Sequence, residues 1–345
     1  MLNRNQTIAI FMEANLDSDY GKMGYGVMRY IANPVACVID SEHAGKQVKD
    51  ACSLPYEYPV VATIDEAHKL GAEVLVLGTA PSGGKVPEDW YPPIQQALSH
   101  GMSIVNGLHD RLNDLFGGEI EDSANQWIWD VRQPAFTPDI ASGRAASLQN
   151  NRVLMVGTDM AIGKMTAGLE VFDWVRQQGQ STAFVATGQI GITITGHGIP
   201  LDAFKVDHAC GAVETAVMEV ADHDTIFVEG QGSLLHPGSS ATLSLMRGSC
   251  ANKLIMCHRA NMTQLRKPAH VQIPSLKEFI KLNEDLASVC GSLTTAKTIG
   301  VALNTSKLRE ADAKDVIKQT EDETGLPVED VYRFGAEKLG KELLN

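Results

Sequence analysis

The chain alternates short, uniformly apolar runs with longer segments in which apolar residues recur every three to four positions. The short runs lack the apolar–polar alternation of a half-exposed strand, which is typical of parallel strands covered on both faces. The longer segments have the length and period of helices. The predicted strands are 7–12, 35–39, 73–77, 103–106, 152–156, 182–187, 225–229, 253–256 and 298–303, and the predicted helices are 24–31, 64–70, 92–99, 164–178, 212–220, 276–287, 309–323 and 336–344. This order predicts an α/β fold with mainly parallel sheets.

The alternation stops between Asp130 and Asn151, where turn-forming residues replace the periodic pattern. A chain of 345 residues also suits two domains of about 150 residues better than one core. We therefore predict an N-terminal domain over residues 1–135, a linker over 136–151 and a second domain over 152–345.

Composition and charge narrow the class of protein. Apolar residues make up 44% of the chain, and the formal charge of −13 would repel a phosphate backbone, so general nucleic-acid binding is not expected. The six cysteines form neither a zinc spacing nor a disulfide framework. The first residues lack the apolar core of a secretory signal, and no run reaches the roughly 18 apolar residues of a membrane span. We expect a cytoplasmic protein without a membrane partner.

The strongest chemical signal is a glycine-bounded loop between a predicted strand and a predicted helix. The loop begins at Gly157 and ends at Gly163-Lys164, where backbone N–H groups and a lysine can hold a pyrophosphate. An ordinary strand-to-helix turn is the alternative. The candidate ligand-binding residues of this loop are Gly157, Thr158, Asp159, Ile162, Gly163, Lys164, Met165 and Thr166.

Two departures from the common P-loop argue against phosphoryl transfer. The spacing between the glycines is one residue longer than usual, and Met165 occupies the position of the Ser or Thr that normally holds Mg²⁺. Thr166 lies about 100° further round the helix. Phosphate binding is therefore predicted without a metal ion.

A second glycine-rich turn, at 78–85, follows the predicted strand 73–77. Such a turn at a carboxyl strand end can form an anion-binding nest, although a flexible turn has the same sequence. The glycines at 21–26 do not match the dinucleotide fingerprint, so no nicotinamide cofactor is expected. We assign no role to His109 or Arg132.

The loop resembles the P-loop of dethiobiotin synthetase and its relatives. A second match is the stretch from Val228 through Glu229 to Gly232, because in those enzymes the corresponding glutamate lies beside the phosphates and metal. The resemblance also implies that Asn304 lies against an adenine ring. The alternative readings are a strand-end carboxylate for Glu229 and a simple turn for Asn304.

Nearly the whole chain is similar to a narrower family, long labelled only as a domain of unknown function. The matching stretches are 78–84, 106–109, 130–134, 163–166, 187–189, 228–237 and 257–259. The resemblance implies a Rossmann-like N-terminal domain and a P-loop NTPase-like C-terminal domain. It further implies a D-glutamate N-acetyltransferase that uses acetyl-CoA as cosubstrate.

The residues can be tested against that activity. Acyl transfer needs a base for the attacking amine, and His236 and His258 follow strands near the loop, with Glu229 as a third catalytic candidate. The two carboxylates of D-glutamate need cations, for which Arg247 and Arg259 are candidates. Gln231 is a further candidate for substrate binding. The alternative for each histidine, the commoner case for a lone histidine, is a structural or merely exposed side chain, and the alternative for each arginine is a solvated surface charge.

Two other functions remain open. One is an ATP- and Mg²⁺-dependent ligase or kinase of the dethiobiotin-synthetase type, which Met165 disfavours. The other is a nucleotide-binding regulatory protein without turnover. A homo-oligomer is expected on base rate alone, because such assemblies are common among two-domain cytoplasmic enzymes.

Overall fold

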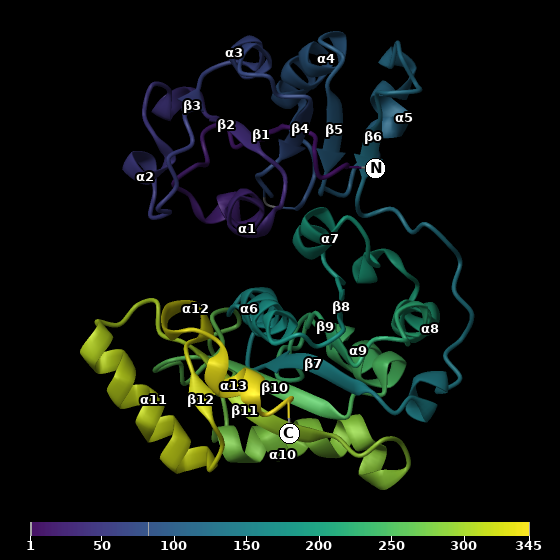
Figure 1. Ribbon diagram of the computed structural model, residues 1–345, viewed down its shortest axis with the longest axis vertical. Helices are drawn as coiled ribbons and strands as arrows, with labels where there is room; N and C mark the ends of the chain where they lie inside the picture. The colour runs from purple at the N-terminus through teal and green to yellow at the C-terminus, as the bar shows by residue number, and fades with distance from the viewer. Residues whose placement is uncertain (1, 82, 345) are drawn as a thin grey trace. The chain divides into compact units, whose positions relative to one another are not determined.

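The computed structural model describes residues 2–81 and 83–344 and divides them into two α/β units (Figure 1). The first unit runs to Gln133 and also includes Gln189–Pro200, whereas the second comprises Pro134–Gly188 and the chain from Leu201 onward. The predicted linker is counted with the second unit, since the buried Glu214 carboxylate accepts hydrogen bonds from the backbone N–H groups of Ser142 and Arg144. The crossing segment 189–200 was expected in the second domain.

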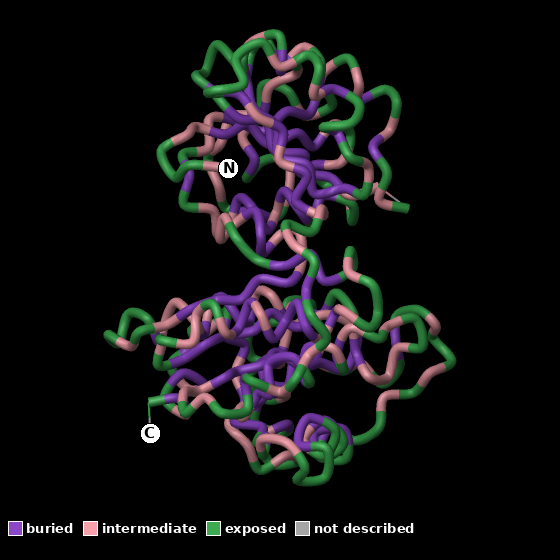
Figure 2. Tube along the Cα trace, turned by 90° about the vertical axis from the view of Figure 1, so that its right-hand side faces the viewer, coloured by how far each residue is buried: buried purple, intermediate pink, exposed green. Residues whose placement is uncertain are grey.

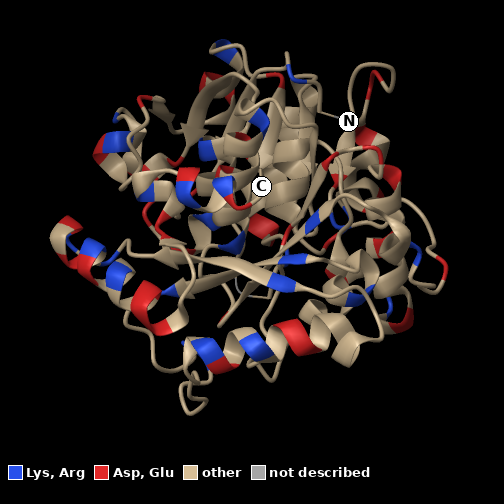
Figure 3. Cartoon of the chain, turned by 60° about the horizontal axis from the view of Figure 1, so that its bottom comes forward, with Lys and Arg blue, Asp and Glu red and all other residues tan. Residues whose placement is uncertain are grey.

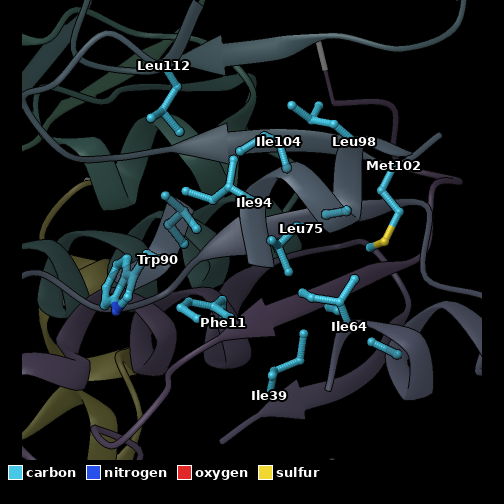
Figure 4. Close-up of a cluster of buried hydrophobic side chains, with 14 of the residues drawn as sticks. Phe11, Ile39, Ile64, Leu75, Trp90, Ile94, Leu98, Met102, Ile104 and Leu112 are labelled. Carbon is cyan, nitrogen blue, oxygen red and sulfur yellow. The ribbon is translucent and has the colours of Figure 1, made fainter. Parts of the chain in front are cut away.

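The first unit is a six-stranded parallel sheet in the order β3-β2-β1-β4-β5-β6. Its strands are β1 (Ile8–Phe11), β2 (Val35–Ile39), β3 (Val60–Val61), β4 (Val74–Leu77), β5 (Ser103–Asn106) and β6 (Ile128–Asp130). Its α-helices are α1 (Lys22–Tyr30), α2 (Val48–Ala51), α3 (Ile64–Lys69), α4 (Tyr91–Ser99), α5 (Leu112–Phe116) and α7 (Gln189–Thr195), which packs on α1. The apolar core between the sheet and α3 and α4 is drawn in Figure 4. Within it the rings of Phe11 and Trp90 pack edge-on, with their centroids 5.1 Å apart.

The second unit is also a six-stranded parallel sheet, in the order β12-β11-β10-β7-β9-β8. Its strands are β7 (Asn151–Gly157), β8 (Thr182–Val185), β9 (Thr225–Val228), β10 (Lys253–Arg259), β11 (Lys297–Asn304) and β12 (Val328–Glu329). Its α-helices are α6 (Lys164–Gln177), α8 (Val206–Glu219), α9 (Ala241–Ser249), α10 (Leu276–Ser288), α11 (Glu310–Thr324), α12 (Val331–Phe334) and α13 (Glu337–Lys341). Helix α6 packs with α12 and α13, while α8, α9, α10 and α11 pack in sequence on one another.

Both sheets are buried on two faces, which explains their apolar strands. The strand segments are purple through the middle of each unit in Figure 2. In Figure 3 the acidic and basic positions are interspersed along the chain. No helix in the described ranges is long and apolar enough to cross a membrane.

The predicted elements are all present, with several ends shifted. Strand β10 continues to Arg259, beyond the predicted end at residue 256, and α8 begins at Val206 rather than at 212. The sequence pattern missed the short elements α2, β3, α5, β6, α7, β12 and α12, together with α9. Strands of two or three residues are too short to show a periodicity.

Candidate functional site

The predicted phosphate loop joins β7 to α6 at the carboxyl edge of the second sheet. Strand β7 ends at Gly157, and the 14-residue helix α6 begins directly at Lys164. Gly163, at the N-cap, has φ +110°, which a side chain would strain, and no side chain caps the helix. The first N–H groups of α6 are therefore left to an external acceptor, and together with the helix dipole they form an anion site.

Lys164 folds back under this loop. Its side chain is buried, and Nζ donates to the backbone oxygen of Asp159 at 2.8 Å. Burial lowers the pKa of Lys164, partly offset by the nearby Cys257, Asp159 and Glu229. The loop thus holds a cation in place. One carbonyl oxygen partly compensates the loss of water around the ammonium group, and the other N–H donors of that group are left for a ligand.

Asp159 holds the loop in place through both carboxylate oxygens. Oδ1 accepts from the N–H of Met160 at 2.7 Å, and Oδ2 accepts from the N–H of Arg266 at 2.9 Å. Its side chain therefore anchors the loop to the segment 260–275, which connects β10 to α10. This contact was not predicted, because it joins residues 107 positions apart without a local motif.

Glu229 lies just beyond β9, on one flank of the loop. Its Oε2 accepts from the N–H groups of Thr187 and Gly188 at 2.8 and 3.0 Å, and Oε1 accepts from Gln231 at 3.3 Å. Burial raises the pKa of Glu229 to about 7, against the lowering effect of those N–H groups and of Lys164. The next residue, Gly230, has to be a glycine, because a Cβ there would lie 1.7 Å from the backbone oxygen of Met155.

His258 and Arg259 occupy the other flank, at the end of β10. His258 is buried, and its Nδ1 lies 2.9 Å from the hydroxyl of Thr158, at the start of the loop. Burial lowers the pKa of His258 to about 4, so the ring is neutral at neutral pH. His258 also lines a cavity of about 310 Å³ together with residues of α10 and α11, including Leu276 and Thr320.

Arg259 and Asn304 brace the outer side of the loop. They are register partners in the neighbouring strands β10 and β11. Arg259 Nη2 donates to the backbone oxygen of Ala161 at 3.1 Å, and Asn304 Nδ2 donates to that of Ile162 at 3.0 Å. The structure therefore brings both predicted residues to the loop.

His236 is partly exposed, in the loop that follows β9. Its Nδ1 accepts from the N–H of Gly238 at 3.1 Å, so Nε2 carries the proton and donates to the backbone oxygen of Lys267 at 2.7 Å. The segment 260–275 thus contacts both Asp159 of the phosphate loop and His236.

The structure does not bring Arg247 to the phosphate loop. Arg247 lies in the last turn of α9, which runs back from the carboxyl end of β9 toward the start of β10 at Lys253. Its exposed side chain is therefore placed toward the opposite edge of the sheet. Helix α9 was not among the predicted elements, so this placement of Arg247 was not expected.

Met165 and Thr166 stand in the first turn of α6, as expected, and are partly exposed. Position 165 therefore offers a thioether where a P-loop kinase offers a hydroxyl. Within the residues that the structure describes, no group of three His, Cys, Asp or Glu side chains is placed to hold a metal ion.

The glycine-rich turn of the first unit has a different construction. Ser82, within the predicted anion-binding turn, lies outside the described residues. Gly84 packs against the ring of His109, since a Cβ would lie 2.4 Å from His109 Cδ2. Arg132 Nη1 lies 2.5 Å from His109 Nε2, which places two residues without a predicted role side by side at this edge of the sheet.

Comparisons with known proteins agree with this architecture. A family model described as a domain of unknown function, the DUF1611_C P-loop domain, matches residues 139–340. A second, the DUF1611_N Rossmann-like domain, matches residues 41–134. The crystal structure of a DUF1611 family protein from Anabaena variabilis is similar with a TM-score of 0.94 and 43% identity, covering 99% of each chain.

Two curated relatives carry a functional name. A protein from Tritonibacter scottomollicae named D-glutamate N-acetyltransferase is 36% identical over 279 residues, which is 80% of this chain and 83% of the relative. A protein of the same name from a Pseudoalteromonas species is 33% identical over the same shares. From the match over residues 139–340 and these relatives, the chain belongs to the DUF1611 family, with a Rossmann-like N-terminal domain and a P-loop C-terminal domain.

Proposed function

We propose that this protein transfers the acetyl group of acetyl-CoA to the amino group of D-glutamate. The observation that supports this most is a phosphate loop that has its lysine buried in place but Met165 at the position of the usual metal-binding hydroxyl. The chain is also 36% identical to a protein named D-glutamate N-acetyltransferase. Acyl transfer needs the pyrophosphate of the cosubstrate to be held and needs no metal-assisted phosphoryl chemistry.

The reaction forms one bond and breaks one. The ammonium group of D-glutamate first gives a proton to a base, and the free amine attacks the thioester carbonyl. The new C–N bond forms while the C–S bond breaks, so the products are N-acetyl-D-glutamate and coenzyme A. As the amide forms, the nitrogen loses a second proton, which the leaving thiolate takes up, and the base releases the first proton to solvent.

The loop supplies the binding part of this scheme. The uncapped N–H groups at the start of α6 and the ammonium group of Lys164 would hold the pyrophosphate of coenzyme A. Glu229 fixes Thr187 and Gly188 beside the loop and is too buried to be the first choice as base.

His236 is the first choice as base. The carbonyl of Lys267 fixes the tautomer with the proton on Nε2, which leaves Nδ1 as the basic nitrogen. Among the residues that the structure describes, Nδ1 accepts only from the N–H of Gly238 at 3.1 Å, a bond that a substrate ammonium would replace. His258, whose pKa burial lowers to about 4, is the weaker base at neutral pH.

The test is a free-thiol assay of the purified chain with acetyl-CoA and either D-glutamate or L-glutamate, with mass analysis of the product. We expect acetylation of D-glutamate to persist in excess EDTA. His236→Ala should lower turnover by roughly 10²–10⁴-fold with CoA binding nearly unchanged. Turnover with ATP that depends on Mg²⁺, without acetyl transfer, would overturn the proposal in favour of the ligase.

A further inference from the structure

The two flanks of the phosphate loop differ in charge. Toward β9 the loop is flanked by the buried carboxyl group of Glu229, and toward β10 by the neutral ring of His258 and the guanidinium of Arg259 beside the amide of Asn304. A polyanionic ligand seated on the loop therefore meets a carboxyl group on the first flank and a positive charge on the second. Any phosphate beyond the pyrophosphate is better placed along β10.

Arg259 is incompletely paired. Its only hydrogen bond among the described residues is the one from Nη2 to Ala161, and within residues 2–81 and 83–344 no carboxylate lies within 4.0 Å of it. Its Nε is buried and has no acceptor in the same part of the chain. A guanidinium with unused donors at the rim of an anion site is the side chain best suited to bind a phosphate in a bidentate manner.

Arg259 lies outside the part of the loop that faces the pyrophosphate. The C=O and N–H of one peptide group point in opposite directions. Arg259 and Asn304 hold the carbonyl oxygens of Ala161 and Ile162, so the N–H groups of Ile162 and Gly163 point away from them. Lys164 and the helix start thus account for the pyrophosphate, and Arg259 is left for another anionic group.

Coenzyme A carries one such group, the 3′-phosphate on its ribose, which dephospho-CoA and ATP lack. We propose that Arg259 binds this 3′-phosphate and so determines the preference of the site for coenzyme A. This inference rests on the proposed function. It replaces the sequence-based assignment of Arg259 to the carboxylates of the amino acid.

The test compares the affinities of the full-length protein for CoA and for dephospho-CoA by calorimetry. The wild type should bind CoA about 10- to 100-fold more tightly, the usual effect of charge-assisted hydrogen bonds to one phosphate. Arg259→Gln should remove that preference while changing the affinity for dephospho-CoA by less than about threefold. Arg259→Lys keeps a cation and a donor for Ala161, and it should retain part of the preference.

Arg266→Gln is the matched control, because Arg266 also adjoins the loop but bonds Asp159 through its backbone N–H. This variant should keep the full preference. Equal weakening of both ligands in Arg259→Gln and Arg259→Lys would overturn the inference, as would a wild type without preference. A wild type that binds neither ligand would instead refute the proposed function itself.

Discussion

The two units each carry a glycine-rich loop after a buried parallel strand, and the two loops differ in how the helix that follows begins. In the second unit the loop after β7 runs straight into α6, and Lys164 at the helix start bonds back to the loop. The free N–H groups of that helix and the lysine converge on the same space. The glycines there shape a loop whose donors remain free for a ligand under the proposed function.

In the first unit the loop after β4 leads to a helix that cannot supply such donors. Helix α4 begins only after a short 3-10 turn, Glu88–Trp90, and carries Pro92 and Pro93 in its first turn. Proline has no backbone N–H, so this helix start offers fewer donors to an anion. Lys85 is exposed rather than folded back.

The glycines of the first unit have a packing role instead. A Cβ at Gly78 would lie 2.5 Å from Ile10 and 3.1 Å from the backbone of Gly24, so the strand end and α1 approach closely there. Glycine after a strand therefore does not by itself predict a phosphate site. A phosphate site also needs a helix that starts directly after the loop and a lysine that folds back against the loop.

The largest expected effect concerns the charge buried beside the second loop. Burial raises the pKa of Glu229 from 4.5 to about 7, so the folded chain binds a proton that the unfolded chain has released between these pH values. The stability that this proton provides is lost as pH rises through 7, by up to about 3 kcal/mol. Glu229→Gln should remove this loss, measured as unfolding free energies at pH 5 and pH 8.

Substitution of His258 should change the pH dependence of stability in the opposite direction. Burial lowers its pKa from 6.5 to about 4, so the unfolded chain takes up the proton first and stability is lost as pH falls through this range. His258→Gln should therefore flatten the acid side of the profile, and Glu229→Gln the neutral side. Profiles that stay parallel to the wild type in both variants would contradict the burial of these groups.

The next effect tests the two lysines against each other. Lys164→Ala should weaken CoA binding by about 10- to 100-fold, because it removes a charge-assisted bond to phosphate. Lys85→Ala, the corresponding change after the first loop, should leave the affinity within about twofold. Calorimetry with CoA and melting temperatures for both variants check this. Equal losses in the two variants would show that the first loop also takes part in binding.

The sequence predicted the parts of this site that are local. The strand, the glycines and Lys164 of the loop all lie within one short motif, and Glu229, His258 and Asn304 stand at strand ends that share one sheet edge. Apolar runs located the strands because a sheet buried on both faces leaves no polar alternation.

The parts that failed to be predicted depend on distant contacts or unrecognised elements. The bond from Arg266 to Asp159 joins residues 107 positions apart. Arg247 was predicted as a cation for the carboxylates of D-glutamate, whereas helix α9, which was not predicted, carries it toward the other edge. The placement of 189–200 with the first unit likewise reflects packing of α7 on α1, which no local pattern records.

The smallest effect is expected from glycines of the first loop. Gly83 has φ +86°, and in the described part of the chain no atom beyond its sequence neighbours lies within 4 Å of an added Cβ, so Gly83→Ala should cost about 1 kcal/mol of stability through backbone strain alone. Gly78→Ala, which meets Ile10 at 2.5 Å, should cost more through overpacking, about 2 kcal/mol. Neither should alter CoA affinity, because neither glycine serves the phosphate loop. Denaturant unfolding with CoA titration checks both, and a loss of CoA affinity in Gly83→Ala without a loss of stability would erase the distinction between the two loops.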